Sequence, residues 1–302
     1  MKLATYNIQY GIGRDGAYDL ARAVKTVATA DVIALQEVER GFARTRRDDQ
    51  PALIEALLPD RHVVYAPLFD RDASERLADG RVRNARRQFG VLTASRWPIL
   101  SARAEILPKH DGGAFFNLTT GFLETIIAAP AGPLRLLNIH LGHLSEPERL
   151  DQIAALARRL AGAADDGGPW SGSDRDAHEW ESPEPAPAPI ATVLMGDFNT
   201  APGEAAYAAL AALVSPEGEA FVDAWTAAAG PGEPAVTYYT NPAQGAFEDS
   251  RIDHIFVPAW LGSRLAIRID ADADGSDHQP VFATIPALGR AANAAGDETP
   301  EI

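Results

Sequence analysis

Cysteine is absent from the 302 residues of this chain. Its absence excludes disulfide bonds, thiolate nucleophiles and zinc sites built on cysteine. Long apolar runs are also missing, since none approaches the roughly 20 residues that a membrane-spanning helix needs. The first residues, Met1–Asn7, lack the apolar stretch and the cleavage site of a signal peptide. We therefore expect a cytoplasmic protein without integral membrane association.

Basic residues are scarce relative to acidic ones. The chain has 27 Lys and Arg against 42 Asp and Glu, a formal net charge of −15. Such a chain is poorly suited to holding nucleic acid phosphates over a broad surface. It can still bind a single phosphate in a metal-filled cleft. Nucleic acid is therefore a possible partner that the net charge does not favour. We separately expect the protein to be a monomer.

No linker separates two complete patterns, so we predict one domain over residues 1–286. Residues 165–189 are rich in Gly, Ser, Asp, Glu and Pro, which predicts a flexible surface insertion. The last residues, 287–302, are expected to form a disordered tail. The stretch from Asp70 to Gln88 carries six arginines. It predicts a solvated loop, with an anion-binding lip over the site as the alternative.

Apolar runs bounded by turn residues predict the strands, and helical spacing with capping residues predicts the helices. Four consecutive strands between Phe89 and Leu141, with no helix between them, indicate mixed or antiparallel pairing. Irregular structure is expected from the fourth helix to Ile252. The predicted strands are Leu3–Gln9, Asp31–Val38, His62–Pro67, Phe89–Ser95, Ile99–Leu107, Asn117–Ala129, Leu134–Leu141, a run beginning at Thr192, Ile252–Val257, Leu265–Ile269 and Val281–Ile285. The predicted helices follow the Asp19 cap, Pro51 and the Ser145/Glu148 capping box, and the fourth passes through Tyr207, Leu210 and Leu213.

The most informative stretch is Thr192–Thr200, an apolar strand that ends abruptly in polar residues. Gly196 allows the strand to bend there, and Asp197 and Asn199 can face one ligand because they are two residues apart. Other predicted strands also end in or carry polar residues that a core does not need: Asn7, Glu37, His140, Asp253, and Asp277 with His278. Each residue alone can be a turn former or a backbone cap. Together they indicate a site, because ligands of layered α/β folds collect at the carboxyl ends of strands.

This set of side chains suits one kind of chemistry. Carboxylate and amide oxygens are ligands for a hard cation such as Mg²⁺ or Mn²⁺. An imidazole beside a carboxylate can move a proton, and a metal, a second imidazole and an amide can share the charge of a five-coordinate phosphoryl group. The residues therefore predict in-line hydrolysis of a phosphate ester.

Six motifs, in order along the chain, resemble those of the endonuclease/exonuclease/phosphatase superfamily, whose members are DNase I-like metal-dependent phosphoesterases. They are Thr-Tyr-Asn at Thr5–Asn7, Leu-Gln-Glu-Val at Leu35–Val38, Asn-Ile-His-Leu at Asn138–Leu141, Gly-Asp-Phe-Asn at Gly196–Asn199, Arg-Ile-Asp-His-Ile-Phe at Arg251–Phe256 and Ser-Asp-His-Gln-Pro-Val at Ser276–Val281. The resemblance extends from Leu3 to about Pro286. It implies an α/β fold in four layers, with two mixed sheets packed face to face and helices outside.

The resemblance also implies metal ligands and phosphate-holding residues. Glu37 resembles the principal ligand of Mg²⁺ or Mn²⁺, with Asn7 and Asp277 beside it. Asp197 and Asn199 resemble the pair that orients the attacking water and holds the phosphate.

The histidines receive separate roles from the same resemblance. His278 resembles the catalytic histidine, and Asp253 resembles the carboxylate that orients it. His140 is implied to donate a hydrogen bond to a phosphate oxygen, and Glu124 is the one candidate for its acidic partner. Both His278 and Asp197 could take the proton of the water, and we expect the His278–Asp253 pair to do so.

Two further histidines lie beside or within these motifs. His143 is expected to be an ordinary loop residue, with lining of the cleft as the alternative. His254 is expected to be structural, because neighbours on a strand face opposite sides of the sheet.

The sequence thus predicts a divalent-metal-dependent hydrolase that acts on phosphate esters, with phosphodiesters favoured over monoesters. One alternative is a DNA or RNA endonuclease or exonuclease. Another is a phosphatase acting on a small molecule or a lipid headgroup. A non-catalytic binding module on the same fold is the alternative from a different class.

Overall fold

The computed structural model describes residues 1–163, 165–166, 188–229, 236–240 and 249–285. The predicted insertion at residues 165–189 and the predicted tail at 287–302 lie almost wholly outside them. In the described part of the chain, no helix is long and apolar enough to cross a membrane.

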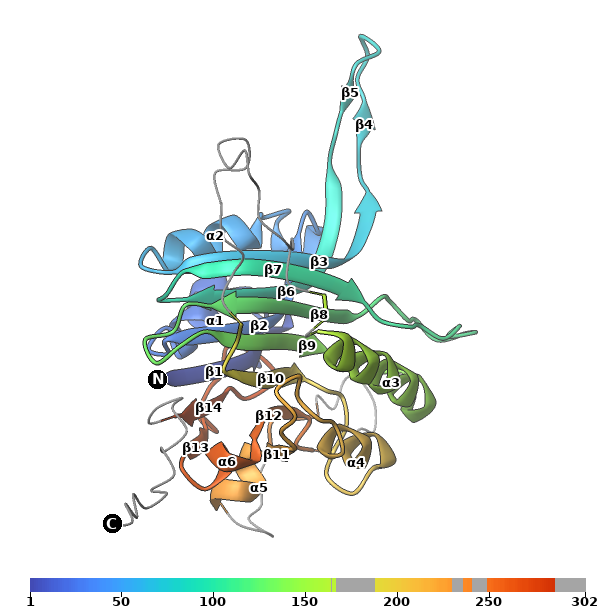
Figure 1. Cartoon of the computed structure of the whole chain (residues 1–302). Helices are drawn as coiled ribbons and strands as arrows, with labels where there is room; N and C mark the ends of the chain where they lie inside the picture. Colours follow the sequence, from blue (N-terminus) through green and yellow to red (C-terminus); the bar gives the residue numbers. More distant parts are fainter. Residues whose placement is uncertain (164, 167–187, 230–235, 241–248, 286–302) are drawn as a thin grey trace, which may run out of the picture.

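Two large sheets form the centre of the fold (Figure 1). The first contains β1 (Lys2–Asn7), β2 (Val32–Arg40), β3 (His62–Asp72), β6 (Arg86–Ser95), β13 (Ala266–Ile269) and β14 (Val281–Thr284). The second contains β7 (Ile99–Ile106), β8 (Gly121–Ile127), β9 (Leu134–His140), β10 (Ala191–Asp197), β11 (Phe221–Asp223) and β12 (Asp253–Pro258). Their strand orders are β13-β14-β1-β2-β6-β3 and β11-β12-β10-β9-β8-β7. Both sheets are mixed, since β1 pairs parallel with β2 and β9 with β10, whereas the other neighbours are antiparallel.

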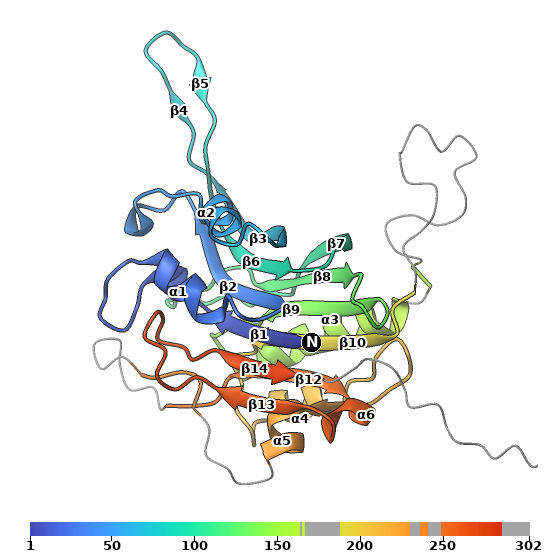
Figure 2. The same ribbon diagram turned by 90° about the vertical axis from the view of Figure 1, so that its left-hand side faces the viewer.

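The helices lie outside the sheets (Figure 2). They are α1 (Leu20–Val27), α2 (Gln50–Leu57), α3 (Glu146–Gly162), α4 (Ala205–Ala211), α5 (Ala224–Ala229) and α6 (Ala259–Gly262), with short 3-10 turns at Gln9–Gly11 and Ala43–Thr45. Apolar residues of α1 and α2 form one buried cluster with the outer face of the first sheet, and those of α3 and α4 form another with the second sheet. A third cluster, which includes Leu3, Leu136 and Val193, fills the space between the sheets. The predicted fold of two packed mixed sheets with helices outside is confirmed.

A polar bridge joins the two sheets within this otherwise apolar interface. Gln36 on β2 donates from Nε2 to Asn138 Oδ1 on β9 at 2.7 Å. Asn138 Nδ2 donates in turn to the backbone carbonyls of Leu35 at 3.1 Å and Leu92 at 2.9 Å. These buried amides are satisfied only when the sheets lie in this one register, so the bridge fixes the position of one sheet relative to the other.

Every strand predicted from the sequence is present, and so are the four predicted helices. Asp19 caps α1 by accepting from Arg22 N, and Pro51 lies in the first turn of α2. The capping box at α3 is only half formed. Ser145 accepts from Glu148 N, but the Glu148 side chain accepts from His110 N and Asn117 Nδ2 instead.

The prediction of a loop at residues 70–88 is wrong, because this segment is a projecting hairpin (Figures 1 and 2). β3 and β6 stay paired as far as Asp72 and Arg86, and β4 (Glu75–Arg76) pairs with β5 (Val82–Arg83) beyond them. Arginines form cross-strand ion pairs in the hairpin, such as Arg86 of β6 with Asp70 of β3 at 2.7 Å and Arg83 of β5 with Glu75 of β4. Cross-strand charge pairing therefore supports a strand ladder in a segment whose composition suggested a loop.

The irregular structure expected before Ile252 is also partly wrong. Residues Phe221–Asp223 form β11 at the edge of the second sheet, and Ala224–Ala229 form α5. Both elements are short, so neither has a periodic pattern long enough to be recognised in the sequence.

The polar bridge makes a testable contribution to stability. In Asn138→Ala the Gln36 amide and two buried carbonyls lose their partners, so we expect the free energy of unfolding to fall by about 2 to 4 kcal/mol. Urea unfolding followed by circular dichroism measures this change. Asn84→Ala, which truncates an exposed asparagine of the hairpin, is the matched control and should change stability by less than about 0.5 kcal/mol. Equal effects of the two substitutions would show that the bridge contributes nothing.

Candidate active site

Strand register in the second sheet brings three of the predicted site residues into one row. Asp197, the last residue of β10, pairs with His140 on β9 and with Asp253 on β12. Directly paired residues of neighbouring strands present their side chains on the same face. Within β10, Gly196 allows the paired backbone of β9 to approach closely, because a Cβ atom there would lie 1.8 Å from the carbonyl oxygen of Ile139.

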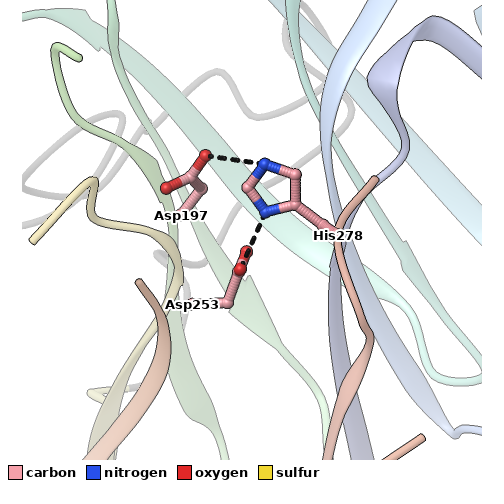
Figure 3. Close-up of side chains that lie close together, drawn as sticks. All are labelled: Asp197, Asp253 and His278. Carbon is pink, nitrogen blue, oxygen red and sulfur yellow. Dashed lines mark hydrogen bonds and ion pairs between the residues drawn. The ribbon is translucent and has the colours of Figure 1, made fainter. Parts of the chain in front are cut away.

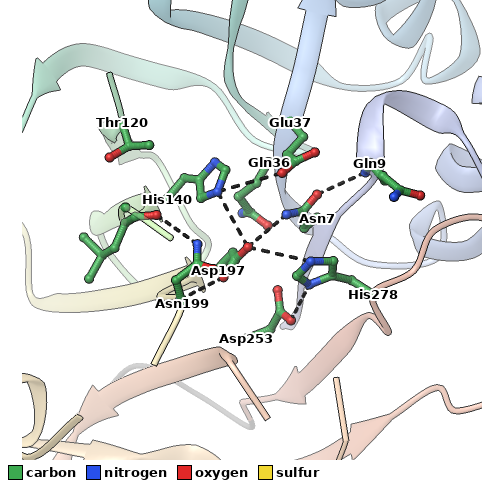
Figure 4. A network of polar contacts seen from close by, with 12 residues as sticks. Asn7, Gln9, Gln36, Glu37, Thr120, His140, Asp197, Asn199, Asp253 and His278 are labelled. Carbon is green, nitrogen blue, oxygen red and sulfur yellow. Dashed lines mark hydrogen bonds and ion pairs between the residues drawn. The ribbon is translucent and has the colours of Figure 1, made fainter. Parts of the chain in front are cut away.

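Four more of the predicted residues come from the first sheet and the segment before its strand β14, on the opposite side of the site (Figure 4). Asn7 is the last residue of β1, and Asp277 and His278 precede β14. Glu37 lies at a bulge in β2, where the register shifts between Gln36 and Val38, and it has a φ of 60°. A left-handed backbone is strained for glutamate and is tolerated where a bulge directs a side chain to one place.

Asp197 contacts residues from both sheets. Its Oδ2 accepts a hydrogen bond from Asn7 Nδ2 at 2.9 Å, and its Oδ1 accepts one from Asn199 N at 2.9 Å. The same Oδ2 lies 3.6 Å from His140 Nε2 and 3.8 Å from His278 Nε2. Burial raises the pKa of Asp197, and the nearby Asp253 carboxylate raises it further. Asp197 is therefore a buried carboxylate with both oxygens engaged and a greater proton affinity than an exposed aspartate.

His278 and Asp253 form a buried pair (Figure 3). His278 Nδ1 donates to Asp253 Oδ2 at 2.8 Å, which directs Nε2 toward Asp197. Burial lowers the pKa of His278, but the Asp253 carboxylate outweighs it, and the pKa rises to about 10. The geometry therefore favours an imidazolium that Asp253 orients and stabilises.

His140 differs from His278 because, among the residues that the structure describes, no carboxylate binds its second nitrogen, Nδ1. Burial lowers its pKa to about 3, and the positive charge of His278 acts in the same direction. Its Nδ1 atom is buried and has no hydrogen-bond partner among the described residues. Glu124, the one candidate from the sequence for an acidic partner of His140, is not that partner. Glu124 lies opposite Leu137 on β9, and both of its oxygens accept from Arg159 Nη2 at 3.0 to 3.1 Å.

Two other carboxylates near His278 have raised pKa values. Burial, with a contribution from Asp277, raises the pKa of Glu37 to about 7. Burial also raises the pKa of Asp277 itself. Partly buried carboxylates that repel one another are stabilised by a cation, and oxygen ligands suit a hard one. Asn7 Oδ1 accepts a hydrogen bond from Gln9 N at 3.0 Å. The second lone pair of this oxygen can bind a metal ion. These three residues fit a divalent metal.

A second set of side chains also has the geometry of a metal site. Asp197, Asp253 and His278 place one possible ligand atom each within 4.8 Å of one another. In this set His278 Nδ1 is already hydrogen-bonded to Asp253 Oδ2. The observed contacts are therefore those of a histidine–aspartate pair that exchanges protons.

The structure also locates the other residues that the sequence singled out. Asn199 has a φ of 50°, and its side chain donates to Leu141 O at 2.9 Å. His143 is exposed and lines the cavity described below, which was the less favoured of the two alternatives for it. His254 is buried on the other face of the sheet, with Nε2 2.9 Å from Thr200 O, as expected for a structural residue.

Gln9 is a site residue that the sequence did not reveal. Its side chain donates from Nε2 to Asp277 Oδ2 at 2.7 Å, and its backbone N–H donates to Asn7. Its φ of 43° is again left-handed. Gln9 is an ordinary polar residue at the end of the predicted strand Leu3–Gln9, so only the folded chain shows that it links Asn7 to Asp277.

Most of the site residues line one cavity of about 850 Å³, whereas Asn7 and Asp253 lie behind its lining. Its polar wall includes Glu37, His140, Asp197, Asp277 and His278. The remainder is rich in aromatic and aliphatic side chains, among them Tyr10, Phe42, Phe69, Phe89, Phe115, Phe116, Leu118 and Leu144. A concave site with a few convergent polar groups is the usual form of a small-molecule site.

Solved structures with the same fold include proteins from different organisms. Truncated TDP2 from Caenorhabditis elegans has a TM-score of 0.55 and 17% identity, covering 94% of this chain and 96% of that chain. A mannosyl-6-phosphatase from Bacteroides thetaiotaomicron VPI-5482 has a TM-score of 0.58 and 15% identity, covering 94% and 99%. The 3′ phosphatase NExo from Neisseria, bound to a product DNA hairpin, has a TM-score of 0.57 and 17% identity, covering 94% and 99%. These similarities establish the fold.

A comparison with curated proteins finds no match. A family model does match, over residues 4–278, and the matched region contains every site residue described above. On that evidence the chain belongs to the Endonuclease/Exonuclease/phosphatase family.

Proposed function

We propose that this protein is a divalent-metal-dependent phosphoesterase that hydrolyses phosphodiesters by in-line attack of water. The observation that carries the proposal is the position of Asp197. This carboxylate of the second sheet contacts Asn7 and His278 from the first sheet and His140 from its own. Membership of a family of hydrolytic phosphoesterases supports the reaction class.

Glu37, Asp277 and Asn7 are the residues that would hold the metal, and Mg²⁺ or Mn²⁺ suits their oxygen donors. When bound, the ion would polarise a phosphoryl oxygen and neutralise part of its charge. Gln9 positions two of these ligands through its hydrogen bonds to Asp277 and Asn7.

The residues on the other side of the cavity would handle the proton and the phosphoryl charge. Asp197 is held by Asn7 and Asn199, and its raised pKa makes it a better base for water than an exposed aspartate. His278 carries a positive charge, which suits the charge that develops on the phosphoryl oxygens or the leaving group. His140 is neutral, and its Nε2, directed at Asp197 and Glu37, can donate a hydrogen bond to a phosphoryl oxygen.

This assignment reverses the expectation from the sequence, which favoured the His278–Asp253 pair as the base. A histidine whose pKa is about 10 already holds its proton at neutral pH, so it is better suited to donate one. Asn199 then serves in part to orient Asp197, because its backbone N–H binds Oδ1.

The net charge of −15 supports a small substrate over a nucleic acid polymer. The names of the proteins that share the fold cover DNA and sugar phosphates, so they do not narrow the substrate of this chain.

Hydrolysis of bis(p-nitrophenyl) phosphate tests the proposal. With Mg²⁺ or Mn²⁺ we expect release of p-nitrophenolate that EDTA abolishes. His278→Ala should slow turnover about 10²- to 10⁴-fold, because it removes a positioned acid and a positive charge. His62→Ala, which truncates an exposed histidine of β3, is the matched control and should retain wild-type turnover. Wild-type rates in His278→Ala would contradict the proposal.

Metal binding can be tested without turnover. We expect Glu37→Gln and Asp277→Asn to weaken Mn²⁺ binding at least about tenfold in isothermal titration calorimetry, because each removes a negative ligand. Asp272→Asn, which neutralises an exposed aspartate outside the cavity, should bind like wild type. If His278→Ala weakens binding while Glu37→Gln does not, the ion instead lies among Asp197, Asp253 and His278.

A further inference from the structure

One wall of the cavity is a continuous series of side chains whose rings contact one another in tilted pairs, and the series begins at His140. The ring of Phe89 lies 6.0 Å from that of His140, and the ring of Tyr10 lies 6.3 Å from that of Phe89. The Arg44 guanidinium lies 3.6 Å from the centroid of Tyr10 and 4.9 Å from that of Phe42. Phe69 extends the series from Phe42, with centroids 6.4 Å apart. All these side chains line the same cavity, and we call them the aromatic wall.

Arg44 is fixed in this wall rather than free in solution. Its Nε and Nη2 atoms donate to Glu39 Oε2 at 3.0 and 2.6 Å. Glu39 is fully buried, and its other oxygen accepts from Thr45 Oγ1 at 2.5 Å. The Nη1 atom takes no part in this ion pair, which holds the guanidinium over the ring of Tyr10. The aromatic wall therefore combines aromatic rings with one positive charge, and both are fixed in position before a ligand binds.

Two more rings line the cavity from the segment between β7 and β8. Phe115 and Phe116 are each 75% exposed, the highest values among the large hydrophobic side chains of the described residues. Exposing two adjacent phenylalanines costs solvation free energy, so their position beside the site suggests that a ligand covers them.

We propose that the aromatic wall, with Phe115 and Phe116, binds a planar aromatic group carried by the phosphate ester that this enzyme hydrolyses. The inference rests on the proposed function and adds the substrate class to it. The position of the wall supports this proposal. The wall begins at His140 beside the phosphate site, so an aromatic group on the phosphate would reach Phe89, the first phenyl ring of the series, directly. In the reaction the oxygen of water bonds to phosphorus, the leaving group departs with the electrons of its P–O bond, and Asp197 takes the proton.

The Arg44 charge favours an aromatic occupant over an alkyl chain. An alkyl chain packed on the wall would remove water from the guanidinium and return no electrostatic interaction. An aromatic ring offers it a π face, and it can also pack against Phe42 and Phe89 in the tilted or offset geometries that rings prefer.

Four diesters that share one leaving group test the proposal. They are the methyl, cyclohexyl, phenyl and thymidine 5′ esters of hexafluoroisopropyl phosphate, whose leaving group carries no ring, and release of hexafluoroisopropanol with Mg²⁺ or Mn²⁺ is followed by fluorine NMR. We expect kcat/KM for the phenyl ester to exceed that for the methyl ester at least about tenfold, as stacking on an aromatic side chain allows. The cyclohexyl ester, which matches phenyl in size without a π system, should resemble the methyl ester. If the thymidine ester equals or exceeds the phenyl ester, the aromatic group is a nucleobase; if it falls to the methyl value, the group is an aryl ring.

Variants of the aromatic wall test whether these residues cause the preference for the phenyl ester over the methyl ester. In Phe42→Leu and in the double variant Phe115→Leu/Phe116→Leu, the phenyl-to-methyl ratio of kcat/KM should fall toward 1. The ratio is formed within each variant, so a general loss of turnover cancels. Ile106→Ala, which truncates an exposed apolar residue of β7 outside the cavity, should keep the wild-type ratio.

Equal rates for the cyclohexyl and phenyl esters, or for the methyl and phenyl esters, would overturn the proposal. Failure of wild type to hydrolyse any of the four esters would instead contradict the proposed function. In that case the wall is tested by calorimetric titration with phenylphosphonate and methylphosphonate. Tighter binding of phenylphosphonate that the Phe42→Leu substitution removes would support the wall, and equal binding would overturn it.

Discussion

The site depends on the burial of one carboxylate between two sheets. Asp197 is 2% exposed, and a buried negative charge is tolerated only when partners replace the water that it has lost. Asn7 supplies one partner from the first sheet and Asn199 N supplies another, so the carboxylate is satisfied only when both sheets are in place. The same requirement draws His140 and His278 to within 4 Å of it. The site therefore assembles only when the two sheets pack against each other.

The rest of the fold stabilises an arrangement that is locally unfavourable. Gln9, Tyr10, Glu37 and Asn199 all have positive φ values, and like charges face one another across the cavity. Such strain and repulsion cost free energy and persist only where the surroundings impose them. The apolar cluster between the sheets and the Gln36–Asn138 bridge supply that constraint. A site held in this way is preorganised for charge that develops only during a reaction.

The sequence predicted the strands, the two-sheet fold and the family, because each site residue follows or lies within an apolar run that reads clearly as a strand. It could not reveal contacts that depend on register between distant strands. The pairing of Asp197 with both His140 and Asp253 follows from strand alignment, and so does the placement of Glu124 beside Arg159 instead of His140. Gln9 and Arg44 were missed for the same reason, since each acts through contacts that the flanking residues do not encode.

A double-mutant cycle on kcat/KM tests the central claim that residues from both sheets act as one unit. Asp197→Asn and His278→Ala are made singly and together, and hydrolysis of one diester is measured for all four proteins. If the residues form one unit, the double variant should be about as slow as the slower single variant, because removal of either partner disables the unit. Additive losses in activation free energy would mean that the two residues act independently, and they would contradict this account.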